Sequence, residues 1–323
     1  MEIIARTDIV EKVKLNEVVI AVIEQAFNDL VQKKVSMPPI MRIDVPENNG
    51  EVDIKSAYIE GDDSFAIKIS SGFFDNPKLG MPSANGMMLL LSAETGIPKA
   101  VLADNGYLTD IRTAAAGAVA AKYLAKRDSK VAGIIGTGAQ ARLQLQALTL
   151  VRDIEKAYVY GRSPDKAQQY KREMEEQLGI PVEPVSEAAE AVRNSDVVVT
   201  TTPATKPIVE AASLHKGVHI TAMGSDAEHK QELSADVLEA ADLFVCDVKD
   251  QSTRLGELRA ATSERVERDA IELGEITTGK ERGRTKDDQI TICDLTGIGV
   301  QDTAIARYTY HYLFKELENQ KVD

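Results

Sequence analysis

The segment KVAGIIGTGAQAR, residues 130–142, connects an apolar run to a helix-forming run through two glycines that lie one residue apart. Gly136 and Gly138 are followed by Ala141, which is the spacing of a G-x-G-x-x-G/A loop. The strand KAYVYG comes next, at the distance expected for a βαβ unit. Backbone amides at the start of such a helix point at a pyrophosphate. The pattern predicts a dinucleotide-binding loop, although a tight strand-to-helix turn in another α/β fold would use the same residues.

The end of the second strand of this unit is where a dinucleotide's ribose is recognised, and here it reads Tyr160-Gly161-Arg162-Ser163. NAD-selective sites commonly place an acidic residue at this point. A guanidinium and a hydroxyl suit a 2′-phosphate better than a bare hydroxyl. Arg162 and Ser163 therefore favour NADP(H) over NAD(H). The alternative, in which Arg162 only stacks on adenine or faces solvent, stays open.

Basic residues alternate with apolar ones along three predicted strands of the first third. They are Lys55 in EVDIKSAYI, Lys68 in SFAIKIS and Arg42 in MPPIMRIDV. Because successive side chains of a strand point to opposite faces, the three cations can share one polar face. Arg112 lies in the first turn of an alanine-rich helix, where anions are normally favoured. The four residues predict a clamp for a substrate carboxylate, and the alternative is ordinary solvated charge.

Asp226 follows the strand VHITAMG within the segment AMGSDAEHKQEL. Ligands of open α/β sheets bind beyond the carboxyl ends of the strands. A carboxylate there can hold an ammonium group or exchange a proton with an imine nitrogen, and its alternative role is to cap a turn. We therefore predict Lys68, Arg112 and Asp226 as catalytic residues. The segment CDLTGIGVQD adds Thr296 and Asp302 as weaker candidates.

The elements that must position these residues fall into two groups. After a helix in LNEVVIAVIEQAFNDLVQKK, the strands EVDIKSAYI, SFAIKIS, NGMMLLLSA and PKAVLADN alternate with hairpin-type turns, which predicts an antiparallel sheet. The alanine-rich helix then begins near Thr109, with Thr109 or Asp110 as its cap.

Between residues 129 and 294, short apolar strands alternate with helices, the pattern of a parallel sheet. The predicted strands are KVAGIIG, KAYVYG, DVVVTTT, VHITAMG, DLFVCD and ITICDLT. A final helix in DTAIARYTYHYLFKELEN should pack back on the N-terminal sheet. We therefore expect an α/β protein with a Rossmann-type domain over 116–299 and an antiparallel-sheet domain over 1–115 and 300–323.

Composition excludes several classes of protein. With 323 residues, 43% of them hydrophobic, and a net charge of −13, the chain can bury a large core but offers no basic face for nucleic acid. Two cysteines and four scattered histidines predict neither a disulfide framework nor a metal site. No apolar run is long enough for a membrane span and no signal peptide is evident, so we expect a cytoplasmic protein.

The assembled segments resemble the ornithine cyclodeaminase/mu-crystallin family. They are MPPIMR, FAIKIS, NPKLGMPS, ETGIPKAVLADNGYLTDIRTAAAGAVAAKYLA, GIIGTGAQAR, TTTPATKPIV, AMGSDAEHKQEL and DLTGIGVQDTAIA, in this order along the chain. The resemblance implies a homodimer in which the antiparallel-sheet domain, residues 1–115 and 300–323, is the substrate-binding and dimerisation domain. It also implies that Lys68 and Arg112 hold the substrate carboxylate and that Asp226 lies at the substrate nitrogen. Lys55 aligns with a basic residue of a related alanine dehydrogenase. Many members carry a basic residue where this chain has Ile40, which leaves the role of Arg42 open.

The predicted cofactor site includes Ala139 and Gln140 after the glycine loop, and three residues in the segments that carry the resemblance: Thr113, Thr202 and Met223. Three further segments, NGEVDIKSAYI, SSGFFDNPKLG and DNGYLTDIRTAAAGAVAA, look most like the branch that contains iminosuccinate reductase and the ectoine-utilisation cyclodeaminase-like proteins.

The resemblance implies an NAD(P)H-dependent reductase of a small α-imino acid. The alternatives are a cyclodeaminase that acts on a diamino acid with loss of ammonia, and a non-catalytic NADPH-dependent binding protein like mu-crystallin.

Overall fold

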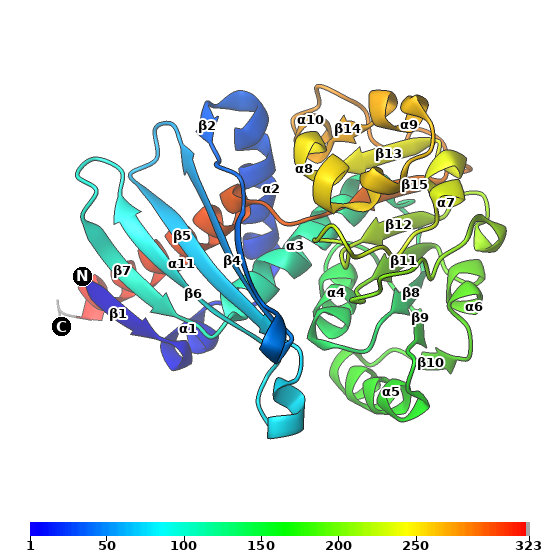
Figure 1. The fold of residues 1–323 in the computed structure, drawn as a ribbon, viewed down its shortest axis with the longest axis horizontal. Helices are drawn as coiled ribbons and strands as arrows, with labels where there is room; N and C mark the ends of the chain where they lie inside the picture. The colour runs from blue at the N-terminus through cyan, green and yellow to red at the C-terminus, as the bar shows by residue number, and fades with distance from the viewer. Residues whose placement is uncertain (321–323) are drawn as a thin grey trace. The chain divides into compact units, whose positions relative to one another are not determined.

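The computed structural model describes residues 1–320 and the side chains of residues 1–314 (Figure 1). The chain divides into two compact units, which we call unit 1 (Met1–Arg112 with Ile298–Asp323) and unit 2 (Thr113–Gly297). The first boundary falls inside helix α3 (Tyr107–Leu124), and the second lies just before helix α11 (Gly299–Gln320). Residues 321–323 of the predicted substrate domain lie outside the described residues. No helix of the described part is long and apolar enough to span a membrane.

Unit 1 is built on a seven-stranded sheet with the order β1-β7-β6-β5-β4-β2, and β3 pairs with β4. Its strands are β1 (Glu2–Ala5), β2 (Val35–Ser36), β3 (Met41–Val45), β4 (Gly50–Ile59), β5 (Ser64–Phe73), β6 (Ala84–Ser92) and β7 (Pro98–Ala103). The helices are α1 (Arg6–Lys12) and α2 (Glu17–Gln32), the short η1 (Pro46–Asn48) and η2 (Asn76–Leu79), and α11. The predicted strands are confirmed, but β1 was not predicted, and its pairing with β7 is parallel.

Helix α11 packs on β4, β5 and α2, as predicted (Figure 1). The hydroxyl of Thr303 donates to the carbonyl of Ala57 at 2.7 Å and accepts from the amide of Ala66 at 3.1 Å. At Gly299 a Cβ atom would lie 2.4 Å from the carbonyl oxygen of Ser56, so only glycine allows this close approach. These contacts fix the start of α11 on one face of the sheet.

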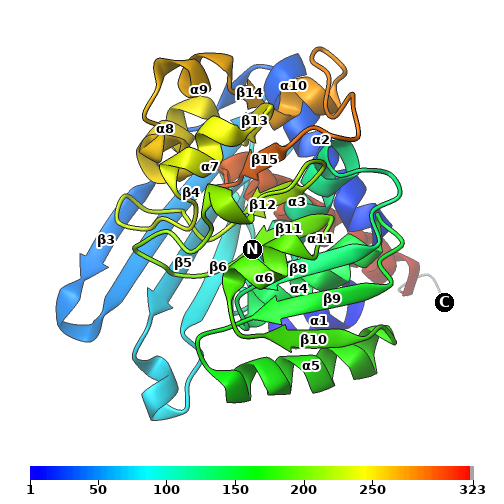
Figure 2. The ribbon, with the colours of Figure 1, turned by 90° about the vertical axis from the view of Figure 1, so that its right-hand side faces the viewer.

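Unit 2 contains an eight-stranded sheet in the order β10-β9-β8-β11-β12-β15-β13-β14, in which every pairing is parallel (Figure 2). Its strands are β8 (Val131–Ile135), β9 (Lys156–Tyr160), β10 (Val182–Val185), β11 (Val197–Thr200), β12 (His219–Ala222), β13 (Leu243–Cys246), β14 (Ile271–Glu272) and β15 (Thr291–Asp294). The six predicted strands are confirmed. The two missed strands lie at the edges, where β10 contains a proline and β14 has two residues.

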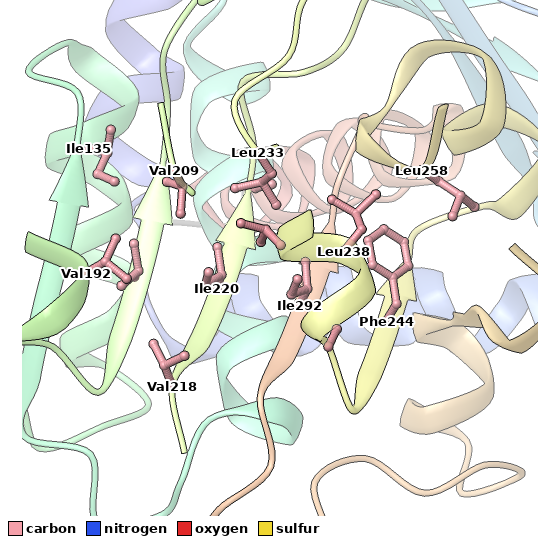
Figure 3. Packing of buried hydrophobic residues seen from close by; sticks show 14 of the residues in the cluster. Ile135, Val192, Val209, Val218, Ile220, Leu233, Leu238, Phe244, Leu258 and Ile292 are labelled. Carbon is pink, nitrogen blue, oxygen red and sulfur yellow. The ribbon is translucent and has the colours of Figure 1, made fainter. Parts of the chain in front are cut away.

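The helices of unit 2 connect these parallel strands. They are α4 (Ala139–Thr149), α5 (Pro164–Leu178), α6 (Ala188–Arg193), η3 (Ala211–Ser213), α7 (Ala235–Ala240), α8 (Lys249–Leu255), η4 (Glu257–Ala260), α9 (Glu264–Asp269) and α10 (Leu273–Thr277). Figure 3 shows strand residues such as Ile220 and Ile292 packed among Leu238 and Phe244. Because helices cover a parallel sheet on both faces, its strands are apolar throughout, which is why they were recognisable in the sequence.

The alanine-rich helix α3 begins earlier than predicted. It starts at Tyr107, and the carboxylate of Asp104 accepts a hydrogen bond of 2.6 Å from the amide of Leu108. The prediction that Thr109 or Asp110 caps the helix was therefore wrong, because both lie inside its first turn. Arg112 consequently lies in the second turn, so the expected conflict with the helix dipole does not arise.

Candidate functional site

A cluster of buried charges lies in unit 1, on the sheet face that α11 covers. Lys55 of β4 and Lys68 of β5 are directly opposite each other across the antiparallel pair. The Nζ atom of Lys68 lies 2.9 and 3.1 Å from the two carboxylate oxygens of Asp302 on α11. The Nε atom of Arg112 lies 3.0 Å from one of the same oxygens. We call Lys55, Lys68, Arg112 and Asp302 the cation cluster.

The cation cluster is buried, with exposed fractions of 7% for Lys55, 1% for Lys68, 5% for Arg112 and 0% for Asp302. The alternative of ordinary solvated charges is therefore wrong for its three basic residues. Charges are buried only where they are paired or serve a ligand. Three cations surround a single carboxylate, so the cluster carries a positive excess that suits an anionic ligand.

Electrostatics within the cluster act in opposite directions on its members. Burial and the charge of Arg112 lower the pKa of Lys68 to about 7; Lys55 also lowers it and Asp302 opposes the shift. Burial alone would raise the pKa of Asp302, but the nearby lysine and arginine charges lower it overall. Asp302 is therefore ionised at neutral pH, whereas Lys68 is poised between its charged and neutral forms.

Gln301 is an uncharged residue that contacts the cation cluster through Arg112. Its Oε1 accepts a hydrogen bond of 2.9 Å from a terminal nitrogen of Arg112. Because the arginine fixes that oxygen, the amide Nε2 points the other way as a donor. This nitrogen is buried and has no hydrogen-bond partner among the described residues. A carboxylate oxygen of a ligand would satisfy it, so the donor set fits an anionic group.

Arg42 has the predicted strand parity, since it pairs in register with Asp53, which lies two residues before Lys55 on the same strand. The structure does not bring its guanidinium to the cation cluster. Arg42 instead donates hydrogen bonds to Asp44, at 2.9 Å, and to Glu51, and it forms an ion pair with Asp53 at 3.8 Å. These three acids already neutralise the arginine, so the geometry gives it a role in joining β3 to β4.

The glycine loop of unit 2 has the geometry that an anion site requires. Gly136 has a φ of 128°, and a Cβ atom there would lie 2.3 Å from the hydroxyl of Thr201. Gly138 is the N-cap of α4, no side chain caps the helix, and no described atom lies within 4 Å of where its Cβ would be. Arg142 donates to the carbonyl oxygens of Thr137 and Gly138. The start of α4, which no side chain caps, therefore fits a phosphate.

The third position of the loop, Ala141, is buried in the apolar core, and the hydroxyl of Tyr170 donates to its carbonyl oxygen at 3.0 Å. A small residue is sufficient for this helix-to-strand packing. Ala139 is exposed and Gln140 is half-buried in the first turn of α4. The departure from a third glycine is therefore compatible with the loop.

Ser163 and Arg162 follow β9 as predicted, but they differ in what they contact. The hydroxyl of Ser163 caps α5 by accepting from the amide of Lys166 at 3.4 Å. Arg162 is exposed. Ser163 therefore has a structural role at the start of α5.

The other predicted cofactor residues also lie in unit 2. Thr113 is half-buried, and its carbonyl accepts from Gln144 at 3.0 Å. Met223 follows β12 and packs against the apolar core. The hydroxyl of Thr202 donates to Glu232 at 2.8 Å.

Glu232 was not predicted, and it organises the carboxyl ends of β11 and β12. Its buried carboxylate accepts from the hydroxyl of Thr200 at 2.6 Å, from the amide of Thr202 at 2.6 Å and from the amide of Gly224 at 2.8 Å. Burial raises its pKa. No motif marked this residue, because its partners come from two separate strands.

Asp226 lies just beyond β12, as predicted, and its carboxylate is 2.7 Å from the Nζ atom of Lys230. Its side chain is 42% exposed, whereas that of Lys230 is 9% exposed. The lysine, which was not predicted, holds the acid in place. Thr296 instead has a structural role, because its hydroxyl bonds to the buried Asp247 at 2.8 Å.

Comparisons with known proteins agree over nearly the whole chain. An uncharacterized cyclodeaminase of Sinorhizobium fredii is 51% identical over 314 residues, covering 96% of this chain and 95% of that protein. The Thermococcus litoralis Δ1-pyrroline-2-carboxylate reductase, solved with NADH and L-proline, is 34% identical with a TM-score of 0.92 and 98% coverage of both chains. The iminosuccinate reductase of Paracoccus denitrificans, solved with NAD+, is 29% identical with a TM-score of 0.88, covering 98% of this chain and 97% of that one.

The ornithine cyclodeaminase/mu-crystallin family model matches residues 2–316, and the match includes the cation cluster and the glycine loop. The α/β architecture predicted from the sequence is confirmed by the two sheets and by these structural neighbours. The chain belongs to the ornithine cyclodeaminase/mu-crystallin family.

Proposed function

We propose that the protein is an NAD(P)H-dependent reductase that converts a small α-imino acid to an amino acid. The observation that carries this proposal is the buried cation cluster, in which three basic residues surround one carboxylate. Two structural neighbours, the pyrroline-2-carboxylate reductase and the iminosuccinate reductase, are named for reactions of this class. The name of the iminosuccinate reductase supports the branch indicated by the sequence, and the side chain of the substrate has to be determined by experiment.

Within the proposed reaction, Arg112 and Lys68 hold the substrate carboxylate. Arginine offers two parallel hydrogen bonds and lysine a point charge. Lys55 adds to the positive field beside them. Holding the carboxylate at two points fixes the orientation of the adjacent C=N bond, and orientation of this kind supplies much of the rate acceleration.

Asp226 is the residue proposed to orient or protonate the substrate nitrogen. A protonated imine accepts hydride more readily than a neutral one, so a carboxylate that stabilises or relays the proton there assists the reaction. The ion pair with Lys230 orients the Asp226 carboxylate.

The proposed cofactor is NADP(H) or NAD(H), with its pyrophosphate at the glycine loop and the start of α4. The open approach at Gly138 and the uncapped first turn of α4 fit this group. When bound, the nicotinamide supplies the hydride. Arg162 favours the 2′-phosphate of NADP(H), while the structural neighbours were solved with NADH and NAD+.

The test is a panel of oxo acids offered with ammonia or methylamine and either NADH or NADPH, followed at 340 nm. Net consumption of the reduced cofactor supports the reductase. Ammonia release from a diamino acid without net change in the cofactor would instead assign a cyclodeaminase. Tight ligand binding without turnover on any imino acid would assign a binding protein.

We also propose a homodimer that forms through the uncovered face of the unit 1 sheet. Met41, Ile54, Ile69 and Met87 lie in one row across four strands. Met41, Ile69 and Met87 are 53%, 38% and 46% exposed. A continuous apolar row of this kind marks an association surface. Ile69→Glu should convert the dimer to a monomer in sedimentation velocity.

The cytoplasmic location expected from the sequence stays a prediction.

A further inference from the structure

Asp302 has an unusual place in the cation cluster, because it is an acid in a site built for an anion. Its carboxylate is fully buried and contacts both Lys68 and Arg112. A bound substrate carboxylate would lie near the same two cations and would be repelled by Asp302. An acid at this position therefore opposes binding unless it performs a task that outweighs the repulsion.

The geometry indicates what that task is. Lys68 lies on β5, Arg112 on α3 and Asp302 on α11, so one carboxylate connects cations from two other elements. The hydroxyl of the adjacent Thr303 fixes this turn of α11 to β4 and β5. Asp302 is thus anchored, and both cations are oriented on it with part of their hydrogen-bonding capacity left over.

We propose that Asp302 is a positioning residue: it holds Lys68 and Arg112 at a fixed separation and favours the ammonium form of Lys68, so that the pair can bind the substrate carboxylate. The inference rests on the proposed function for the identity of that carboxylate. The contacts of Asp302 with Lys68 and Arg112 do not depend on that function, because all three residues belong to unit 1.

Every charged group that faces Lys68 affects the equilibrium between its ammonium and neutral forms. Lys55 from β4 and Arg112 from α3 disfavour the ammonium form, burial does the same, and Asp302 from α11 is the one group of the cluster that favours it. Without Asp302, the lysine would lose its proton at a lower pH. An opposite charge within about 4–6 Å typically shifts a pKa by roughly 1–3 units.

The test uses Asp302→Asn, which keeps the shape and removes the charge, and Lys55→Met, which removes a like charge. The pKa of Lys68 is read from the 13Cε shift of lysine-labelled protein, with the signal assigned by its loss in Lys68→Arg. We expect the pKa to fall by roughly 1–3 units in Asp302→Asn and to rise in Lys55→Met. In turnover assays, the pH at which kcat/KM begins to fall on the basic side should decrease in Asp302→Asn and increase in Lys55→Met. In Asp302→Asn, KM should rise by a larger factor than kcat falls.

Thr303→Val is the matched control, because Thr303 is the neighbouring buried residue and its hydroxyl bonds to the backbone of β4 and β5. It should lower the melting temperature and leave both the Lys68 pKa and the basic side of the kcat/KM profile unchanged. An Asp302→Asn protein with an unshifted Lys68 pKa would overturn the inference. A shifted pKa in a protein that turns over no imino acid would retain the inference and reject the proposed function instead.

Discussion

The cation cluster and the glycine loop are both built to meet an anion, but they are assembled in different ways. The loop is a contiguous segment, residues 136–141, whose backbone amides supply the donors. The cluster is made of side chains from four elements, and Lys68 and Asp302 are 234 positions apart. Backbone donors need only a local conformation, whereas side-chain donors need a tertiary fold that compensates for burying charge. The two sites should therefore respond differently to mutation.

The largest effect is expected from Arg112→Met. Removing one partner of a buried charge pair costs roughly 2–5 kcal/mol, so kcat/KM should fall by roughly 30- to 4,000-fold. The affinity for the cofactor, measured by fluorescence titration, should stay within about twofold of the wild type. If kcat/KM and the affinity for the cofactor fell by the same factor, the cation cluster and the glycine loop would not act as independent sites.

The loop is tested by a pair of glycine substitutions. Gly138→Ala introduces a methyl group where no described atom lies within 4 Å, so the melting temperature should be unchanged while the dissociation constant for the cofactor rises roughly tenfold. Gly136→Ala should also lower the melting temperature, because its φ of 128° and its contact with Thr201 exclude a side chain. Unchanged cofactor affinity in Gly138→Ala would place the pyrophosphate elsewhere.

The two sites should also differ in their dependence on pH. Under the proposed function, Lys68 binds the substrate carboxylate in its protonated form, which predominates below its pKa of about 7. As the pH rises above that value, kcat/KM should fall by about tenfold per unit. Cofactor binding to backbone amides involves no such titration and should stay constant from pH 7 to 9. A profile of kcat/KM that is flat over this range would show that the charge of Lys68 is not needed.

The smallest effect is expected at the cofactor's ribose. Arg162 is exposed, and exposed charge pairs contribute little, so Arg162→Ala should raise KM for NADPH by roughly two- to fivefold. KM for NADH should not change. Equal changes for the two cofactors would remove the basis for an NADP(H) preference.

Several features of this fold could be predicted from the sequence because they depend on residues that are close together along the chain. Six strands of the parallel sheet were recognisable as short apolar runs, and the loop by its glycines and the elements on either side. The alternation along β4 and β5 correctly put Lys55 and Lys68 on one face. The start of α3 was misplaced, because its cap is a carboxylate that precedes the helix, at Asp104.

Other features were decided only by the tertiary structure. The alternation of side chains along a strand determines which residues share a face of a sheet, but it does not determine which face a helix will cover. The cations lie on the face covered by α11, and the opposite face, which carries Ile69 and Met87, is the exposed one. In the same way, the pairing of Arg42 with acids and the contacts of Glu232 and Asp302 join residues that sequence spacing does not relate. Local pattern determined what the chain could form, and the energy of pairing buried charges across distant segments decided which residues meet.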